Sequence, residues 1–235
     1  MSLLPIVARQ RTPEAVGLPT RQTFDQKAVN CCLSCAIASA MEATDISTPP
    51  LAPLFHFHFA GGQNSLSAGL TVSQAQGTLL RKGICAFTAH PFSISPQDVA
   101  RDPSEEAVSD GFKRRLIDAE SGALRWKPVP DIHPEKVWKR YLIAGFPIVI
   151  ALQPNQEYLG LNADNAVLSN NGGPYSNVGH AAVVIGYSDA DDSFIVQDSR
   201  AGTAFGIEGQ WFLPYKLCTS PFLMMAFSLA PDDFN

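Results

Sequence analysis

The spacing of apolar residues in the first half of the chain indicates helices. The run from Cys35 to Thr44 is rich in Ala and other helix formers, and Ile37, Ala40 and Met41 recur at helical spacing. We therefore predict a buried helix with Cys35 in its first turn. The same reasoning, supported by Pro near a start and Gly after an end, predicts further helices over 72–82, 105–121 and 134–144.

The pattern changes in the second half, where short β-branched and aromatic runs are separated by Gly, Asn and Asp. Such runs are typical of antiparallel strands, and we predict them over 147–152, 180–187, 193–196 and 210–213. The first residues lack periodicity and are rich in Pro, Thr, Gln and Arg, which indicates an extended arm. The predicted organisation is an α+β fold with an arm (1–24) and one domain (25–235), divided into a helical subdomain (25–130) and a β-rich subdomain (131–235).

Composition excludes several classes of protein. Of the 235 residues, 46% are hydrophobic and 17% charged, as in a folded globular chain, and no apolar run reaches the length of a membrane span. The net charge of −5, with no basic cluster beyond Lys113-Arg114-Arg115, argues against nucleic-acid binding. Five cysteines without regular spacing favour a reducing compartment. Because the N-terminus lacks a signal-peptide pattern, we expect a cytoplasmic protein, or one exported by another route.

Cys35 and His180 are the candidate reactive pair. A thiolate is stabilised at a helix N-terminus, and a nearby imidazole can accept the proton of the thiol. His180 precedes an apolar strand, and Asp198 follows the next one, so the carboxylate could orient the ring. A cysteine at such a position is also commonly a small buried hydrophobe, a lone histidine is commonly structural, and Asp198 could be a turn residue.

Cys32 and Cys35 also form a Cys-x-x-Cys motif, which occurs in zinc sites and redox pairs. Zinc would need two more ligands, and His56 and His58 are the only neighbours in the sequence. Their alternation places them on one face of an extended segment or on a helix surface, and neither gives a convincing second ligand pair. We therefore expect no metal and no cofactor.

Several segments together resemble the papain-like (C1 family) cysteine peptidases, in their compact bacterial form. In that family the His and Asn lie about 130–150 residues after the Cys, whereas here His180 lies 145 and Asp198 163 residues after Cys35. The matching segments, in order, are Asp25-Gln26, Cys32-Leu33-Ser34-Cys35, Ser67-Ala68-Gly69, Gly179-His180-Ala181, Asp198-Ser199-Arg200 and Gly209-Gln210-Trp211.

The resemblance implies a peptidase site in a cleft between a helical half and an antiparallel sheet or barrel. Cys35 would be the nucleophile, His180 the base and acid, Asp198 the orienting group and Gln26 the oxyanion donor. Its substrate-binding positions would be Ser34, Ser67, Gly69 and Gly179.

The chain departs from the family pattern at several positions. The family Gln usually lies six residues before the nucleophile, whereas Gln26 lies nine before Cys35, so the resemblance requires a three-residue insertion and makes Asn30 a fallback donor. Ala36 and Arg200 stand where the family usually has Trp, and Asp198 where it usually has Asn.

These departures leave two further functions open. One is an inactive papain-fold binding module, and the other an amidase, a transferase or a delivered effector with the same nucleophile. The expected partner is a peptide or protein substrate, with no nucleic acid and no membrane. An inhibitor or immunity-type partner is left open.

Overall fold

The structure is a computed structural model, and it describes residues 13–20, 23–62, 69–116, 125–130, 134–200, 204–231 and 234. It contains a seven-stranded sheet in which every strand pair is antiparallel. The strand order is β2-β7-β3-β4-β5-β6, with β1 pairing to β4. The described strands do not close into a barrel, so the antiparallel-sheet form of the prediction is confirmed. The strands are β1 (Ala15–Gly17), β2 (Arg125–Pro128), β3 (Ile148–Leu152), β4 (His180–Ser188), β5 (Ser193–Gln197), β6 (Gln210–Pro214) and β7 (Leu223–Ala230).

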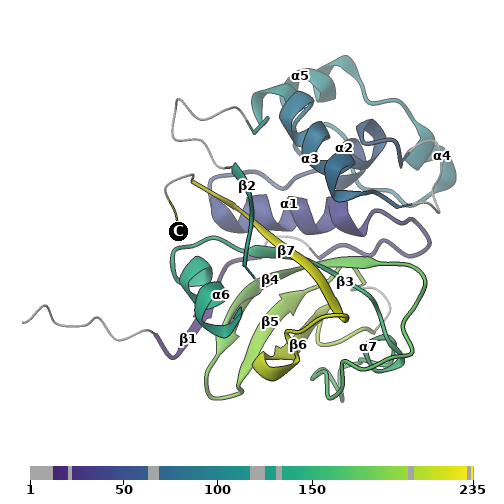
Figure 1. Ribbon diagram of the computed structural model, residues 1–235. Helices are drawn as coiled ribbons and strands as arrows, with labels where there is room; N and C mark the ends of the chain where they lie inside the picture. The colour runs from purple at the N-terminus through teal and green to yellow at the C-terminus, as the bar shows by residue number, and fades with distance from the viewer. Residues whose placement is uncertain are drawn as a thin grey trace, which may run out of the picture.

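Helices α1 to α5 form a layer over one face of the sheet, whereas α6 and α7 lie away from that layer (Figure 1). Helix α1 lies between the two layers, packing on β3, β4 and β7 on one side and on α2 and α3 on the other. Besides a short 3-10 turn at Tyr215–Leu217, the helices are α1 (Cys32–Thr44), α2 (Pro53–Phe59), α3 (Val72–Arg81), α4 (Pro96–Ala100), α5 (Glu105–Lys113), α6 (Pro134–Ile143) and α7 (Gln156–Leu159).

Helix α1 is buried along nearly its whole length because both of its faces meet other elements. Small Ala side chains allow this close approach on two sides. The helix begins at Cys32, three residues earlier than predicted, with Cys31 at its N-cap. Cys32, rather than Cys35, therefore occupies the first position of the helix.

Strand β4 is packed between α1 and α6, and its first residue is His180. Its interior positions from Ala181 to Tyr187 are all buried, because α1 and α6 both pack on it. Near its end, a Cβ at Gly186 would lie 2.2 Å from the carbonyl oxygen of Val16. Only glycine therefore lets β1, which belongs to the predicted arm, pair closely with β4.

Several elements differ from the sequence prediction. The apolar segment with His56 and His58 is a helix, α2, and both rings are buried rather than on a surface. Helix α5 ends at Lys113, and the end of its predicted range, 117–121, lies outside the described residues. Five elements were not predicted, namely β1, β2, β7, α4 and α7; four are only three to five residues long, and β7 lacks a clear alternating pattern.

Candidate active site

Cys32 and His180 meet where the start of α1 packs on the start of β4. The Cys32 sulfur is hydrogen-bonded to the His180 ring and to the backbone N–H of Ala181. Because His180 Nε2 is hydrogen-bonded to Asp198, the ring nitrogen that contacts Cys32 is Nδ1. The thiol also lies at the N-terminus of a 13-residue helix, where the unpaired N–H groups favour negative charge.

Asp198 lies behind the His180 ring, at the end of β5. Since β4 and β5 are antiparallel neighbours with Val183 opposite Gln197, the residue that follows β5 lies near the start of β4. His180 Nε2 lies 2.9 Å from Asp198 Oδ1, and the Asp198 side chain is fully buried. The structure therefore brings His180 and Asp198 together, as predicted from the sequence.

The second oxygen of Asp198 also accepts hydrogen bonds. Tyr158 Oη donates to Oδ2 at 2.8 Å, and Trp211 Nε1 donates to the same atom at 3.2 Å. Both oxygens of the carboxylate thus face donors. An ionised Asp is acceptor-only and suits these surroundings without rearrangement.

The charges of the three groups are strongly coupled. Burial alone would lower the pKa of His180, but the Asp198 carboxylate and the Cys32 thiolate outweigh it and raise that pKa to about 10. Burial alone would raise the pKa of Cys32, yet the charge and hydrogen bond of His180 bring it below the ordinary thiol value. The pKa of Asp198 is likewise lowered, because His180 outweighs the effect of burial. These directions favour a thiolate–imidazolium pair at neutral pH.

Cys35 lies elsewhere, one helical turn further along α1 and in the hydrophobic core. Its side chain is buried, and its Sγ lies 3.7 Å from Cys31 Sγ. Burial and the neighbouring Cys31 raise the pKa of Cys35 well above the ordinary value. The expected contact between Cys35 and His180 is therefore not what the structure shows: an apolar site without a cationic partner keeps a thiol protonated.

Gln26 is held by the loop after Asp198. Ser199 Oγ donates to Gln26 Oε1, and the Gln26 backbone N–H donates to the Ser199 carbonyl at 2.9 Å. This anchoring of Oε1 makes Nε2 the donor end of the side chain. Gln26 is buried and borders the same cavity as Cys32.

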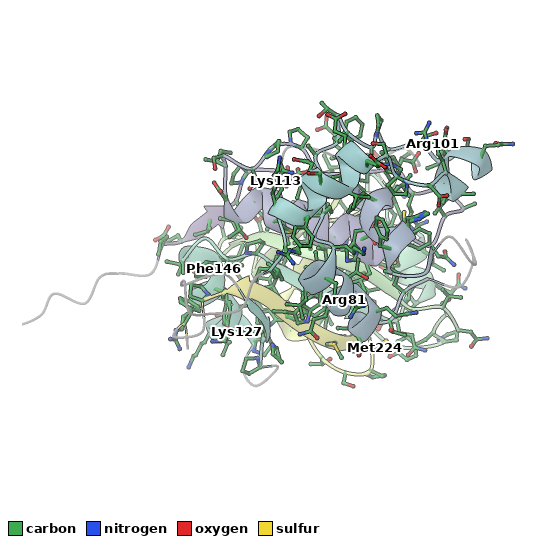
Figure 2. All side chains as sticks on the ribbon, turned by 90° about the horizontal axis from the view of Figure 1, so that it is seen from above. Arg81, Arg101, Lys113, Lys127, Phe146 and Met224 are labelled. Carbon is green, nitrogen blue, oxygen red and sulfur yellow. The ribbon has the colours of Figure 1, made fainter. Side chains whose placement is uncertain are left out.

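Two cavities meet at the Cys32–His180 pair. One, of about 390 Å³, is lined by residues of the α1 start, the 69–72 segment, β3 and β4. Met224, at the start of β7, also lines it and is 60% exposed. Figure 2 labels this side chain on the yellow strand. The other, of about 430 Å³, is lined by a different set that includes Gln26 and Arg200. Both cavities share Asn30, Cys32, Val178, Gly179 and His180.

The four predicted substrate-binding positions have different locations. Gly69 lines the first cavity and Gly179 lines both. Ser34 is fully buried and its Oγ lies 2.8 Å from His56 Nδ1, so it faces the interior between α1 and α2. Ser67 lies outside the described residues.

Three residues of the site escaped the sequence reasoning: Cys32 as the partner of His180, and Tyr158 and Trp211 as partners of Asp198. A signal for Cys32 was present, since Gln26 lies six residues before it without any insertion. No comparable signal marked Tyr158, because it lies in a four-residue helix 40 positions from Asp198.

Other properties of the described ranges bear on cofactors and membranes. No group of three or more His, Cys, Asp or Glu gathers within them as a metal site would require. None of their helices combines the length and the apolar character that crossing a membrane demands.

The sequence is similar to proteins that are named as peptidases or peptidase-like. The sequence profile of the Peptidase_C39 like family matches residues 113–207, a segment that includes His180 and Asp198. An uncharacterised peptidase C1-like protein of Acanthamoeba polyphaga mimivirus is 23% identical over 203 residues. That alignment covers 82% of this chain and 64% of the viral protein, so the chain spans less than two thirds of that relative.

Solved structures of cysteine proteases share the fold. Xylellain, a cysteine protease from Xylella fastidiosa, superposes with a TM-score of 0.78 at 19% identity, over 94% of this chain and 87% of that one. The bromelain protease of Ananas comosus gives a TM-score of 0.68 at 16% identity, over 93% and 98%. A Carica candamarcensis cysteine protease in complex with E-64 gives 0.66 at 13%, over the same shares. The chain therefore has the papain-like α+β fold, as predicted.

Proposed function

We propose that this chain is a thiol hydrolase that cleaves peptide amide bonds, with Cys32 as its nucleophile. The observation that carries the proposal is the line Cys32–His180–Asp198 at the junction of two cavities. The raised pKa of His180 and the lowered pKa of Cys32 support a charged pair that is ready before substrate arrives. Cys32, and not Cys35, is therefore the proposed nucleophile.

In this mechanism the Cys32 thiolate attacks the carbonyl carbon of the scissile bond. The imidazolium of His180 then gives its proton to the leaving amine, which departs and leaves a thioester on Cys32. His180, now neutral, takes a proton from water as water attacks the thioester. Collapse of the second tetrahedral intermediate releases the acid and restores the thiolate–imidazolium pair.

Two donors are available for the developing oxyanion. One is the backbone N–H of Cys32 in the first turn of α1, and the other is Nε2 of Gln26. Preformed donors aimed at a developing oxyanion lower the barrier by about 3 kcal/mol each. We assign Gln26 this role, as the sequence resemblance implied.

The two cavities, both lined by Cys32, give a peptide room around its sulfur. Leu70, Val72 and Met224 offer apolar contacts on one side. Gly69 lines one cavity and Gly179 lines both, so their backbones border the space that an extended substrate would occupy. We assign substrate binding to Gly69 and Gly179, and not to Ser34.

A pair of matched substitutions on α1 tests the proposal. Cys32→Ala removes the nucleophile, and we expect hydrolysis of a mixed fluorogenic peptide library to fall at least about a thousandfold. Cys35→Ala removes a sulfur from the same helix, and the activity should stay within about threefold of wild type.

Three outcomes contradict the proposal. Activity lost in Cys35→Ala and kept in Cys32→Ala would return the role to Cys35. Activity kept in both variants would exclude a thiol mechanism. No hydrolysis by a folded wild-type protein, together with an unreactive Cys32, would favour the inactive binding module.

A further inference from the structure

Tyr158 connects a short helix to the buried oxygen of Asp198. The Tyr158 hydroxyl donates to Asp198 Oδ2 at 2.8 Å, while Oδ1 of the same carboxylate faces His180 Nε2 at 2.9 Å. A carboxylate held at one oxygen can turn less about its Cβ–Cγ bond. Holding Oδ2 therefore fixes the direction in which Oδ1 points.

The Tyr158 ring is itself tightly held. It is buried, and it packs against His180 with ring centroids 5.7 Å apart and against Phe205 and Trp211 at 5.1 and 5.5 Å. The Asn155 side chain accepts from the Tyr158 backbone N–H at 2.8 Å, which fixes the start of α7. The hydroxyl is thus carried to Asp198 by a rigid support.

The Tyr158 hydroxyl stays protonated and is polarised from its other side. Burial, followed by the nearby Asp198 charge, raises the pKa of Tyr158 well above its usual value, so the group remains a donor. Arg200 hydrogen-bonds to the same hydroxyl, and its guanidinium carbon lies 5.7 Å from the ring centroid. A hydroxyl that accepts from a cation donates more strongly. The chain of contacts therefore runs Arg200, Tyr158, Asp198, His180, Cys32.

We propose that Tyr158 is a positioning residue for the reactive pair, because its hydroxyl holds Asp198 so that Oδ1 meets His180 Nε2. This inference rests on the proposed function and adds to it a residue beyond the nucleophile Cys32, the acid and base His180 and the orienting group Asp198. Without the hydroxyl, the longer bond from Trp211 Nε1 at 3.2 Å is the remaining donor to Oδ2 among the described residues, and the carboxylate is held less firmly. The imidazolium is then held less well, and the thiolate it stabilises forms less readily.

Tyr158→Phe tests the proposal because it removes the hydroxyl and keeps the ring. With a fluorogenic peptide we expect kcat to fall about tenfold to a hundredfold and KM to stay within about twofold, since the lost contact serves the reaction more than substrate binding. Alkylation of Cys32 by iodoacetamide should show its midpoint pH displaced upward by about one unit. Circular dichroism and thermal unfolding check that the variant is folded.

A matched control is available at Tyr187. That ring is equally buried, and its hydroxyl donates to the Pro13 carbonyl at 2.7 Å, at the pairing of β1 with β4. Tyr187→Phe removes a buried hydroxyl of the same kind, so it should lower stability and leave kcat and the alkylation midpoint unchanged. The contrast separates positioning from a general loss of packing.

Two results distinguish failure of this inference from failure of the proposed function. If Tyr158→Phe has the kcat and the alkylation midpoint of wild type, the tyrosine serves packing only and the inference is overturned. If wild type hydrolyses nothing, the proposed function fails, yet the alkylation midpoints of the wild-type and Tyr158→Phe proteins still test whether the hydroxyl tunes Cys32. An unchanged midpoint would overturn the inference in that case too.

Discussion

Helix α1 contacts two imidazole rings, those of His56 and His180, and the two rings have different surroundings. On one side Ser34 Oγ lies 2.8 Å from His56 Nδ1, and His56 Nε2 lies 3.0 Å from the Ala75 carbonyl. On the other side Cys32 meets His180, whose Nε2 faces Asp198. Both sets consist of a side-chain nucleophile, an imidazole and an oxygen acceptor.

The oxygen behind each ring makes the difference. A neutral carbonyl behind His56 cannot offset burial, and the pKa of that ring falls to about 4. A buried carboxylate behind His180, with the Cys32 thiolate on the other side, raises the pKa to about 10. His56 therefore stays neutral and joins α1, α2 and α3, whereas His180 is charged and borders two cavities. In the proposed function, charge and access, more than the order of groups, make the Cys32 set reactive and the Ser34 set structural.

Asp198→Asn removes the charge that distinguishes the two sets, and we expect the largest effect after loss of Cys32. If the oxygen of the new amide faces His180, the amide NH₂ group faces the Trp211 N–H, and two donors oppose each other. If the amide is flipped, its NH₂ group faces His180 Nε2, which must then accept a hydrogen bond, and the ring takes the wrong tautomer. kcat/KM should fall on the order of a thousandfold or more. Steady-state kinetics on the folded variant measures this, and a loss below tenfold would contradict the assigned role.

Gln26→Ala should have the next largest effect, because it removes the proposed oxyanion donor. The His56 set has no described residue that corresponds to Gln26. We expect kcat to fall by about two to three orders of magnitude. Asn30→Ala is the matched comparison, since Asn30 lines both cavities and was the fallback donor in the sequence. A greater loss of kcat for Asn30→Ala than for Gln26→Ala would transfer the role to Asn30.

The pH dependence of kcat/KM should reflect the coupled pair. Activity requires the Cys32 thiolate, whose pKa is lowered, so the acid limb should lie below the ordinary thiol value of 9.0. It also requires the His180 imidazolium as the acid for the leaving amine, so activity should fall as pH rises through about 10. A single limb at the pKa of a free thiol would show that no ion pair forms.

Ser34→Ala should have the smallest effect on catalysis. The change leaves His56 Nδ1 buried without its partner, so the free energy of unfolding should fall by about 1–3 kcal/mol. The kcat of the folded variant should remain within about twofold of wild type. Denaturant unfolding and kinetics at the same temperature separate the two quantities, and a large loss of kcat with unchanged stability would contradict the structural role.

The sequence predicted the fold class, the main helices, four strands and the His180–Asp198 pair because periodicity and order along the chain carry those features. It did not identify which cysteine faces His180. The predicted helix began at Cys35 because the Ala-rich run begins there, but pairing with His180 depends on which side of α1 meets β4. The six-residue interval from Gln26 to Cys32 carried that information, whereas contacts between distant segments, such as Tyr158 with Asp198, had no local pattern.

The most direct test of the central claim is to map which cysteine a thiol reagent modifies. Wild-type protein is treated near neutral pH with an epoxide inhibitor of the E-64 type, and the adduct is located by tandem mass spectrometry. We expect modification of Cys32, abolished when His180 is replaced by Ala, with Cys35 unmodified in the folded protein. Modification of Cys35 with Cys32 left free would contradict it.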